Sequence, residues 1–384
     1  MGRPGAHGGT LSAVEVIAVA LGMGALAGAA WLPPKATRVS GALFGGLIAF
    51  ALARIAWGIP LGAAASVSFA IVLFRFAPGT VLRRVTFLVP SLLLLVFVTT
   101  LLMYHAPGSP FAGEKVASPQ VEAALRAHFG VPKSAVEFFG IYLRRLLVEG
   151  SLGPSVKVQG RNVEALLRPA LPVSIALGLL ALVIASALGL WLGIVAGLKP
   201  NSAADYASTG LSALGLALPS FVIGAIGIVV FALKLGWLPV AGWGDLRHIV
   251  LPAVTLALPY AAYIARLARG GTIEVMSQDF IRTARAKGVP ESAVVLRHAL
   301  KGAILPVVSY LGPAAAGIMT GSFVVETLFG IPGMGQWFVR GAINRDYSVV
   351  LGTAIVYFGL VILFNLLVDL AYAWLDPRLR SSGP

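Results

Sequence analysis

The run LPVSIALGLLALVIASALGLWLGIVAGL, residues 171–198, carries no charged side chain. A helix that crosses the hydrocarbon core of a bilayer needs about 20 predominantly apolar residues, so this run is long enough to span a membrane. Comparable runs recur along the chain, which is 58% hydrophobic and only 11% charged. The sequence therefore predicts an all-α, polytopic membrane protein and argues against a soluble globular fold.

Nine apolar runs are expected to cross the membrane: residues 11–31, 40–57, 59–76, 86–104, 171–198, 208–233, 249–267, 304–325 and 349–375. Residues 40–76 could instead form one span, but they are far longer than one crossing requires, so we expect two. The first run could be a cleaved signal peptide, because small residues lie near its end. Its apolar part is longer than a signal peptide needs, and we expect an uncleaved helix.

The distribution of Lys and Arg sets the orientation, because cytoplasmic loops carry an excess of these residues. With residues 277–306 placed in the cytoplasm, fifteen Lys and Arg side chains fall in inside segments and five in short outside segments. The basic residues behind the net charge of +14 are thus distributed according to the membrane topology. We expect contacts with membrane lipid and none with nucleic acid. The chain has no cysteine, which excludes disulfides, thiolate metal sites and cysteine nucleophiles.

One basic stretch interrupts the apolar runs: SQDFIRTARAKGVPESAVVLRHALKGAILP, residues 277–306. Ser277 is of a type that caps helix N-termini, and it predicts a short helix over residues 278–286. Gly288 can adopt the left-handed conformation that ends a helix, and Pro290 suits the first turn of a second helix. The stretch is expected to form a helix, a tight corner and another helix.

The short helix has two faces on a wheel of 100° per residue. Phe280 and Ala284 share one face, whereas Arg282 and Arg285 share the other. A compact ridge of this kind can dock into a groove on a partner protein. The alternative is an ordinary basic loop held by anionic lipid headgroups. The docking residues we expect are Phe280, Arg282, Thr283, Ala284, Arg285, Ala286, Lys287 and Gly288.

Several short motifs are spread along the chain: APGSP at 106–110, GSLGPS at 150–155, RHALKGAILP at 297–306, VETLFGIPGMG at 325–335, Asp346-Tyr347 and Asp376-Pro377-Arg378. Together with residues 279–307, these stretches resemble the B-type permease subunits of bacterial dipeptide and oligopeptide ABC importers. That family also includes nickel and glutathione importers. The resemblance extends over residues 83–380, about three quarters of the chain.

Some positions depart from the pattern of that family. They are Ser109 and Ser151 in place of Asp, and Lys301 and Gly302 in place of Arg and Asn. In the permease loop that contacts the ATPase, Gly288 stands where the general importer signature has its glycine. Residues 282–284 replace the Glu-Ala-Ala of that signature, which is typical of the peptide branch. The resemblance therefore implies that the eight expected docking residues couple this chain to an ATPase.

The resemblance implies a type I ABC importer permease fold with six core helices, to which residues 1–76 add about three more. Residues 77–169 then hold the first core helix and an extracytoplasmic segment. Residues 170–376 form the transmembrane module with a cytoplasmic coupling loop at 270–303, and residues 377–384 are a cytoplasmic tail. The implied partners are a second related permease, two cytoplasmic ATPases and an extracellular substrate-binding protein. The implied location is the bacterial cytoplasmic (inner) membrane.

No nucleotide-binding loop of the pattern Gly-x-x-x-x-Gly-Lys-Ser/Thr occurs in the chain. The nearest fragment, Pro-Lys-Ser at residues 132–134, lacks the glycine before the lysine and lies in an outside segment. For an ATP-driven importer, the nucleotide must then be hydrolysed by a partner. We expect neither a catalytic residue nor a cofactor in this chain.

Glu326 is one of the few charged residues inside a predicted span, where a charge at the membrane centre costs roughly 2.5 to 3.5 kcal/mol. It lies at the outer end of that span, just before a glycine-rich turn at residues 330–335. A functional interpretation places an outer gate here, with Glu326, Phe329, Pro332 and Gly333 as candidates. A structural interpretation, in which the carboxylate caps a packed helix end, stays open.

The expected function is that of a permease in an ATP-driven importer of short peptides, working by alternating access, with nickel or glutathione as alternative cargo. An ion-coupled secondary transporter is the alternative class. It would use buried carboxylates or histidines as coupling sites and often an inverted repeat, and the sequence offers neither a repeat nor a convincing relay. A membrane hydrolase would need a nucleophile or a metal set, whereas the five histidines are scattered.

Overall fold

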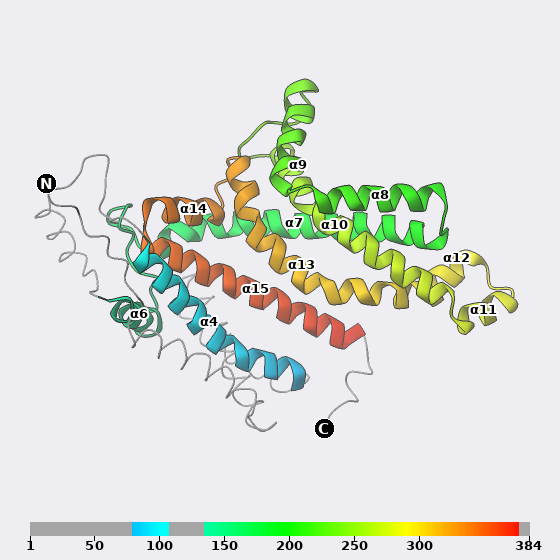
Figure 1. The fold of residues 1–384 in the computed structure, drawn as a ribbon, viewed down its shortest axis with the longest axis horizontal. Coiled ribbons are helices and arrows are strands. Elements are labelled where there is room, and N and C mark those ends of the chain that lie inside the picture. The colour runs from blue at the N-terminus through cyan, green and yellow to red at the C-terminus, as the bar shows by residue number, and fades with distance from the viewer. Residues whose placement is uncertain (1–78, 107–133, 376–384) are drawn as a thin grey trace, which may run out of the picture. The chain divides into compact units, whose positions relative to one another are not determined.

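The computed structural model describes residues 79–106 and 134–375 (Figure 1). Apart from one isolated β-bridge between Pro154 and Asn162, the regular structure of these residues is helical. The elements are α4 (Gly79–His105), α6 (Ala135–Arg144), η1 (Arg145–Glu149), α7 (Val163–Leu198), α8 (Ala203–Ala217), α9 (Ser220–Gly227), η2 (Ile228–Lys234), α10 (Leu246–Met276), α11 (Asp279–Ala286), α12 (Glu291–Ala293), η3 (Val294–Ala299), α13 (Leu300–Leu328), α14 (Met334–Asn344) and α15 (Tyr347–Leu375). The three spans expected before residue 77, residues 107–110 and the tail after residue 375 lie outside the described residues.

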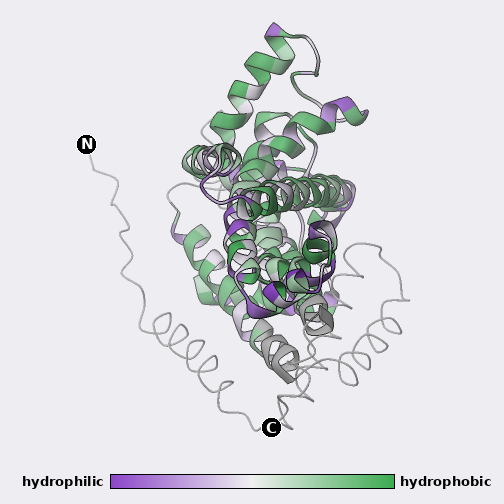
Figure 2. Ribbon diagram, turned by 90° about the vertical axis from the view of Figure 1, so that its right-hand side faces the viewer, coloured by the Kyte–Doolittle hydropathy of each residue, from purple (hydrophilic) through white to green (hydrophobic). Residues whose placement is uncertain are grey.

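Four described helices are long and apolar enough to cross a membrane: Val163–Leu198, Leu246–Met276, Glu291–Leu328 and Tyr347–Val368. The pair formed by α8 and α9–η2 is a fifth candidate, and α4 contains the shorter apolar stretch Pro90–His105. Hydrophobic residues dominate the long helices (Figure 2). Each of the six predicted core spans therefore corresponds to helical structure, which confirms the all-α, polytopic membrane architecture.

The predicted span 208–233 is wrong as a single straight helix. Its two halves, Ala203–Ala217 and Ser220–Lys234, meet at an angle of 106°. Pro219 explains the break, because a proline disfavours helical backbone at the residue before it. Leu218 accordingly has φ −89° and ψ 125°, an extended conformation. As a result, α9 leaves the direction of α8 (Figure 1).

The chain divides into two compact units. Of the described residues, the first unit contains 79–106, 134–168 and 337–359, and the second contains 169–336 and 360–375. In the first unit, α4 packs on α6 through Phe97 and Phe139, whose rings meet edge to face with centroids 5.3 Å apart. The helix α6 buries Ala135, Phe138 and Tyr142 on one side.

Asp346 joins two motifs of the first unit that lie far apart in the sequence. Its Oδ2 accepts hydrogen bonds from Ser155 Oγ at 2.5 Å and from the backbone N–H of Lys157 at 3.1 Å. Leu152 donates its backbone N–H to the Glu164 carboxylate nearby. The GSLGPS motif is thus fastened to the segment just before α15, and these motif residues have a structural role.

The second unit is centred on α7, α10 and α13. The large side chains at its core are Leu177, Leu256, Ile264, Ile318 and Met319. Glycines of α7 bring that helix against α10: a Cβ atom on Gly189 would lie 2.7 Å from the Ala261 carbonyl oxygen, and one on Gly193 would lie 2.4 Å from that of Ala265. Close helix packing therefore accounts for these small residues.

Candidate functional sites

The basic stretch forms the predicted helix, corner and second helix, but the predicted N-cap is wrong. Ser277 keeps helical backbone, with φ −86° and ψ −9°, and ends α10. Its hydroxyl donates back to the Glu274 carbonyl at 2.7 Å. Gln278 takes the extended conformation that precedes α11, and its side chain makes no capping hydrogen bond. The helix α11 therefore begins at Asp279.

The corner after α11 follows the prediction at Gly288, whereas Pro290 lies just before the second helix and not in its first turn. Gly288 has φ +76°, the left-handed conformation that glycine adopts without steric cost, and its N–H donates to the Arg285 carbonyl at 2.9 Å. Pro290 immediately precedes the next helix, which begins at Glu291 and continues through η3 into α13. The segment is thus a compact appendage with a fixed turn.

The faces of α11 differ from the predicted ridge. Ile281 is 0% exposed and Ala284 is 7% exposed, whereas Phe280 is 50% exposed. The two buried side chains pack against Val275, Met276, Val289, Val294 and Ala299. Ala284 therefore faces this chain's own small core and does not form a shared external ridge with Phe280. The outer face of α11 presents Phe280, Arg282, Thr283, Arg285, Ala286 and Lys287.

A bidentate ion pair braces the corner. Arg285 donates from Nε to Glu291 Oε2 at 3.1 Å and from Nη2 to Oε1 at 2.6 Å. These hydrogen bonds raise the pKa of the Arg285 guanidinium above its ordinary value. Arg282 has only a long contact, 3.4 Å, with exposed Asp279. The exposed face of α11 is therefore basic, and Arg285 serves the geometry of the corner.

The second candidate site, the outer turn, is held by a buried carboxylate. Glu326 is 0% exposed. Its Oε1 accepts from Ser174 Oγ at 2.7 Å, and its Oε2 accepts from the Gly335 N–H at 2.7 Å. Ser174 Oγ in turn accepts from the Met334 N–H at 2.9 Å. This network fastens the turn between α13 and α14 to α7.

The other outer-gate candidates belong to the same turn. Phe329 and Gly333 are buried, whereas Pro332 is exposed. A Cβ atom on Gly333 would lie 2.4 Å from Glu326 Oε2, so only glycine leaves the carboxylate in place. Gly330 has φ +61° and starts the turn. The geometry supports the structural interpretation of Glu326, and a gating role of the turn stays a prediction.

The ion pair between Asp205 and Arg269 was not identified from the sequence. Asp205 is buried at the start of α8, and Arg269 of α10 donates from Nε and Nη2 to its two oxygens at 2.5 and 2.8 Å. The Asn201 N–H adds a hydrogen bond of 2.9 Å to the same carboxylate. The pair clasps the α7–α8 connection to α10. No local signal could reveal it, because its members belong to different helices.

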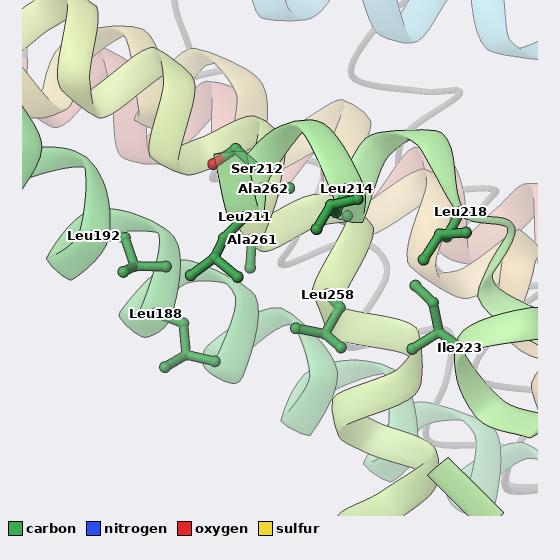
Figure 3. Close-up of a pocket in the computed structure, with 11 residues that line it drawn as sticks. Leu188, Leu192, Leu211, Ser212, Leu214, Leu218, Ile223, Leu258, Ala261 and Ala262 are labelled. Atoms are coloured by element: carbon green, nitrogen blue, oxygen red, sulfur yellow. The ribbon is translucent and has the colours of Figure 1, made fainter. Parts of the chain in front are cut away.

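An apolar groove of about 270 Å³ lies between α7, α8, α9 and α10 (Figure 3). Its lining consists of Leu188, Leu192, Leu211, Ser212, Leu214, Gly215, Leu218, Ile223, Leu258, Ala261 and Ala262. Ser212 is the one polar side chain of this lining, so the groove suits hydrocarbon rather than a polar cargo. In the part of the chain that the structure describes, no three His, Cys, Asp or Glu side chains lie close enough to hold a metal ion.

Comparisons with known proteins converge on one family. A family model described as "Binding-protein-dependent transport system inner membrane component" matches residues 189–381. The oligopeptide transport system permease protein OppB of Escherichia coli (strain K12) is 46% identical over 302 residues, which cover 78% of this chain and 98% of that protein. OppB of Haemophilus influenzae is 44% identical with the same coverage.

Two further matches are more distant. The dipeptide transport system permease protein DppB of Bacillus subtilis (strain 168) is 40% identical over 299 residues, which cover 78% of this chain and 97% of that protein. A crystal structure of an amino acid ABC transporter with histidines aligns at 17% identity and a TM-score of 0.44, covering 55% of this chain and 94% of that chain.

Proposed function

Because this chain belongs to the family of binding-protein-dependent transport system inner membrane components, we propose that it is the pathway-forming permease subunit of an ATP-driven importer of short peptides. The observation that carries the proposal is the 46% identity to a protein named for oligopeptide transport, over nearly its full length. The subunit works in the bacterial cytoplasmic membrane with a second permease, two ATPases and a substrate-binding protein. It contributes a pathway that alternates between outward and inward access.

The outer face of α11 docks on an ATPase subunit. Phe280 enters an apolar recess of the partner, and Arg282 and Lys287 meet acidic groups at its rim, because half-exposed apolar and exposed basic side chains are complementary to such a groove. Ala284 supports docking indirectly, because it belongs to the small core that holds α11 against α10 and η3. Arg285 contributes by fixing the corner through Glu291.

The outer turn moves as one body with α7 and α13. Its support is the hydrogen-bond network that links Glu326, Ser174 and the backbone of Met334 and Gly335. Pro332 is the candidate that remains accessible on this turn. A change in access at the outer end therefore displaces the turn without unravelling it.

Uptake by membrane vesicles that contain the complete transporter tests the function. We expect accumulation of a labelled short peptide to require internal ATP and to persist after ionophores collapse the proton and sodium gradients. Vesicles with a catalytically inactive partner ATPase are the matched control and should not accumulate peptide. Uptake that continues with the inactive ATPase, or that stops when the gradients collapse, would reject the importer in favour of an ion-coupled transporter.

A further inference from the structure

The exposed face of α13 is polar, although the helix as a whole is apolar. Among the residues of α13 whose side chains the structure describes, the exposed ones are Lys301, Ser309, Pro313, Thr320 and Thr327. The last four share one face, since their spacings of four and seven residues are close to whole helical turns. On α7 and α9, by contrast, large hydrophobic side chains are exposed: Leu179, Leu180, Val183, Leu188, Trp191, Val195, Phe221 and Ile226.

This contrast separates two environments. Apolar side chains suit contact with lipid, whereas polar groups inside the membrane face a bundle interior or a water-filled cavity. At 1.5 Å per residue, Ser309 and Thr327 are about 27 Å apart along the helix axis, which is most of a hydrocarbon core about 30 Å thick. The polar face of α13 therefore extends across the membrane as a pathway lining would.

The hydroxyls of this face are free to accept hydrogen bonds. Ser309, Thr320 and Thr327 each donate their proton to a carbonyl of their own helix, at 3.2, 2.9 and 2.7 Å respectively. A hydroxyl that donates in this way keeps acceptor lone pairs. The face thus presents acceptors, and a cargo with N–H groups, such as a peptide backbone, is complementary to it.

An arginine lies beside this face. Arg266 is exposed in the spanning helix α10, and its Cζ lies 5.0 Å from the centre of the Tyr263 ring. That ring contacts Tyr310 of α13, with centroids 4.3 Å apart. Among the side chains that the structure describes, no carboxylate pairs with Arg266, whereas Arg269 is paired with Asp205. Arg266 lies at the cytoplasmic end of the predicted span 249–267, where an exposed cation without a carboxylate partner can bind an anionic ligand.

The helix register brings the cation to the level of one of the hydroxyls, that of Ser309. A Cβ atom on Gly317 would lie 2.5 Å from Tyr260 Oη, and one on Gly271 would lie 2.6 Å from the Ala303 carbonyl oxygen. The contacts run in opposite chain directions, so α10 and α13 are antiparallel. Between these two contacts, Arg266 falls at the level of Ser309.

We propose that Arg266 binds the terminal carboxylate of the transported peptide beside Ser309, while Thr320 and Thr327, farther along the pathway, accept hydrogen bonds from its backbone N–H groups as the peptide passes. Tyr263 holds the guanidinium in position through its ring face. The proposal rests on the peptide-import function and adds a binding site within the membrane. An anionic lipid headgroup offers a similar charge to Arg266, and the experiment separates the two.

The test uses the complete transporter in proteoliposomes and one peptide in two forms, with a free C-terminal carboxylate or a C-terminal amide. The measured quantity is the ratio of the two ATP-dependent uptake rates. Any preference of the binding protein is the same in every variant, so a change in this ratio reports on the altered residue. Expected is a roughly tenfold fall of the ratio in Arg266→Gln, the size of one lost charge-assisted hydrogen bond.

Four further variants sharpen the result. Arg266→Lys keeps a positive charge and should retain most of the preference for the free carboxylate. Lys301→Gln removes an exposed cation from the same helix as the hydroxyls and should leave the ratio unchanged. Thr320→Val should slow uptake of both peptide forms equally, and Thr320→Ser should restore it.

An unchanged ratio in Arg266→Gln, with both forms still transported, overturns the proposal. So does a defect that is equal for both forms and disappears in purely zwitterionic liposomes, because the arginine then serves lipid headgroups. If the wild-type transporter takes up neither form with ATP, the peptide-import function itself fails. That outcome is distinct, because it appears before any residue is changed.

Discussion

Glu326 uses both oxygens of a fully buried carboxylate. Ser174 donates to one oxygen and the Gly335 N–H to the other, each at 2.7 Å. Gly333 lies against the same carboxylate, where any side chain would collide. Leaving a buried donor without an acceptor costs about 1–3 kcal/mol, so the residues of this network depend on one another.

We therefore predict that Glu326→Gln destabilises the protein by about 1–3 kcal/mol, because the amide NH2 group would face a donor. Thermal unfolding in detergent, followed by circular dichroism, measures the effect. The control is Thr327→Val at the next residue, which is exposed and donates only within its own helix. Equal stability of Glu326→Gln and the control would show that the network does not hold the turn.

Local rules at single residues succeed where one backbone property decides the outcome. Gly288 ends α11 because its left-handed φ is the feature that the sequence rule describes. Ser277 does not cap α11, contrary to the prediction. A serine hydroxyl can bond forward to the next helix or back to the preceding one, and here it donates back to the Glu274 carbonyl of α10. The burial of Ile281 in place of Phe280 depends on the position of η3, which no local pattern contains.

Substitutions in α11 can distinguish effects on docking from effects on folding. Phe280 is half-exposed and Ala284 is buried, so the two positions report on different properties. We predict that Phe280→Ala preserves the amount of folded transporter but lowers peptide uptake and peptide-stimulated ATP hydrolysis at least tenfold, because an interface anchor is lost. Leu296→Ala on η3 is the control, since this side chain is exposed nearby and should have little effect.

Normal uptake by Phe280→Ala would contradict docking through this face. Ala284→Trp, by contrast, should reduce the amount of folded protein, because the enlarged side chain overfills the core beneath α11. Expression and thermal stability of Ala284→Trp equal to wild type would contradict the observed burial. The two variants therefore test the surface and the core of one helix separately.

The packing of α7 on α10 gives a matched pair of glycine substitutions. A Cβ atom on Gly193 would lie 2.4 Å from the Ala265 carbonyl oxygen, whereas one on Gly210 of α8 meets nothing within 4 Å. We predict that Gly193→Ala lowers the free energy of unfolding by about 1–3 kcal/mol, because two backbones must separate. Gly210→Ala should be neutral or stabilising, and equal unfolding temperatures for the two variants would refute the close contact.

The helices themselves were predictable, but their breaks were not. Apolar runs mark the core spans because hydrocarbon requires them. Pro219 breaks its span, yet Pro252 and Pro259 lie inside α10, and Pro306 and Pro313 lie inside α13. Membrane helices tolerate proline where neighbouring groups satisfy the freed carbonyls. The identity of the residue therefore does not reveal which proline bends the chain.

The membrane topology of the whole molecule can be tested directly because the chain has no cysteine. We predict that Thr283→Cys reacts with a membrane-impermeant maleimide only from the cytoplasmic side, and Ile343→Cys only from the opposite side. Both positions are exposed. Labelling in intact cells and in inverted vesicles measures the two accessibilities, and the cysteine-free parent is the control. Labelling of both positions from the same side would refute the topology.

The close contact between α7 and α10 at their glycines makes the second unit stiff. Close-packed interiors are hardly compressible, so α7 and α10, whose backbones lie in direct contact, move as one rigid pair. The helix α11 follows one end of α10, and Ser174 of α7 accepts a hydrogen bond from the outer turn. In the proposed importer, a displacement of α11 would then reach the outer turn with little lost to elastic deformation, so we expect the rate of transport to follow the nucleotide cycle of the partner ATPase.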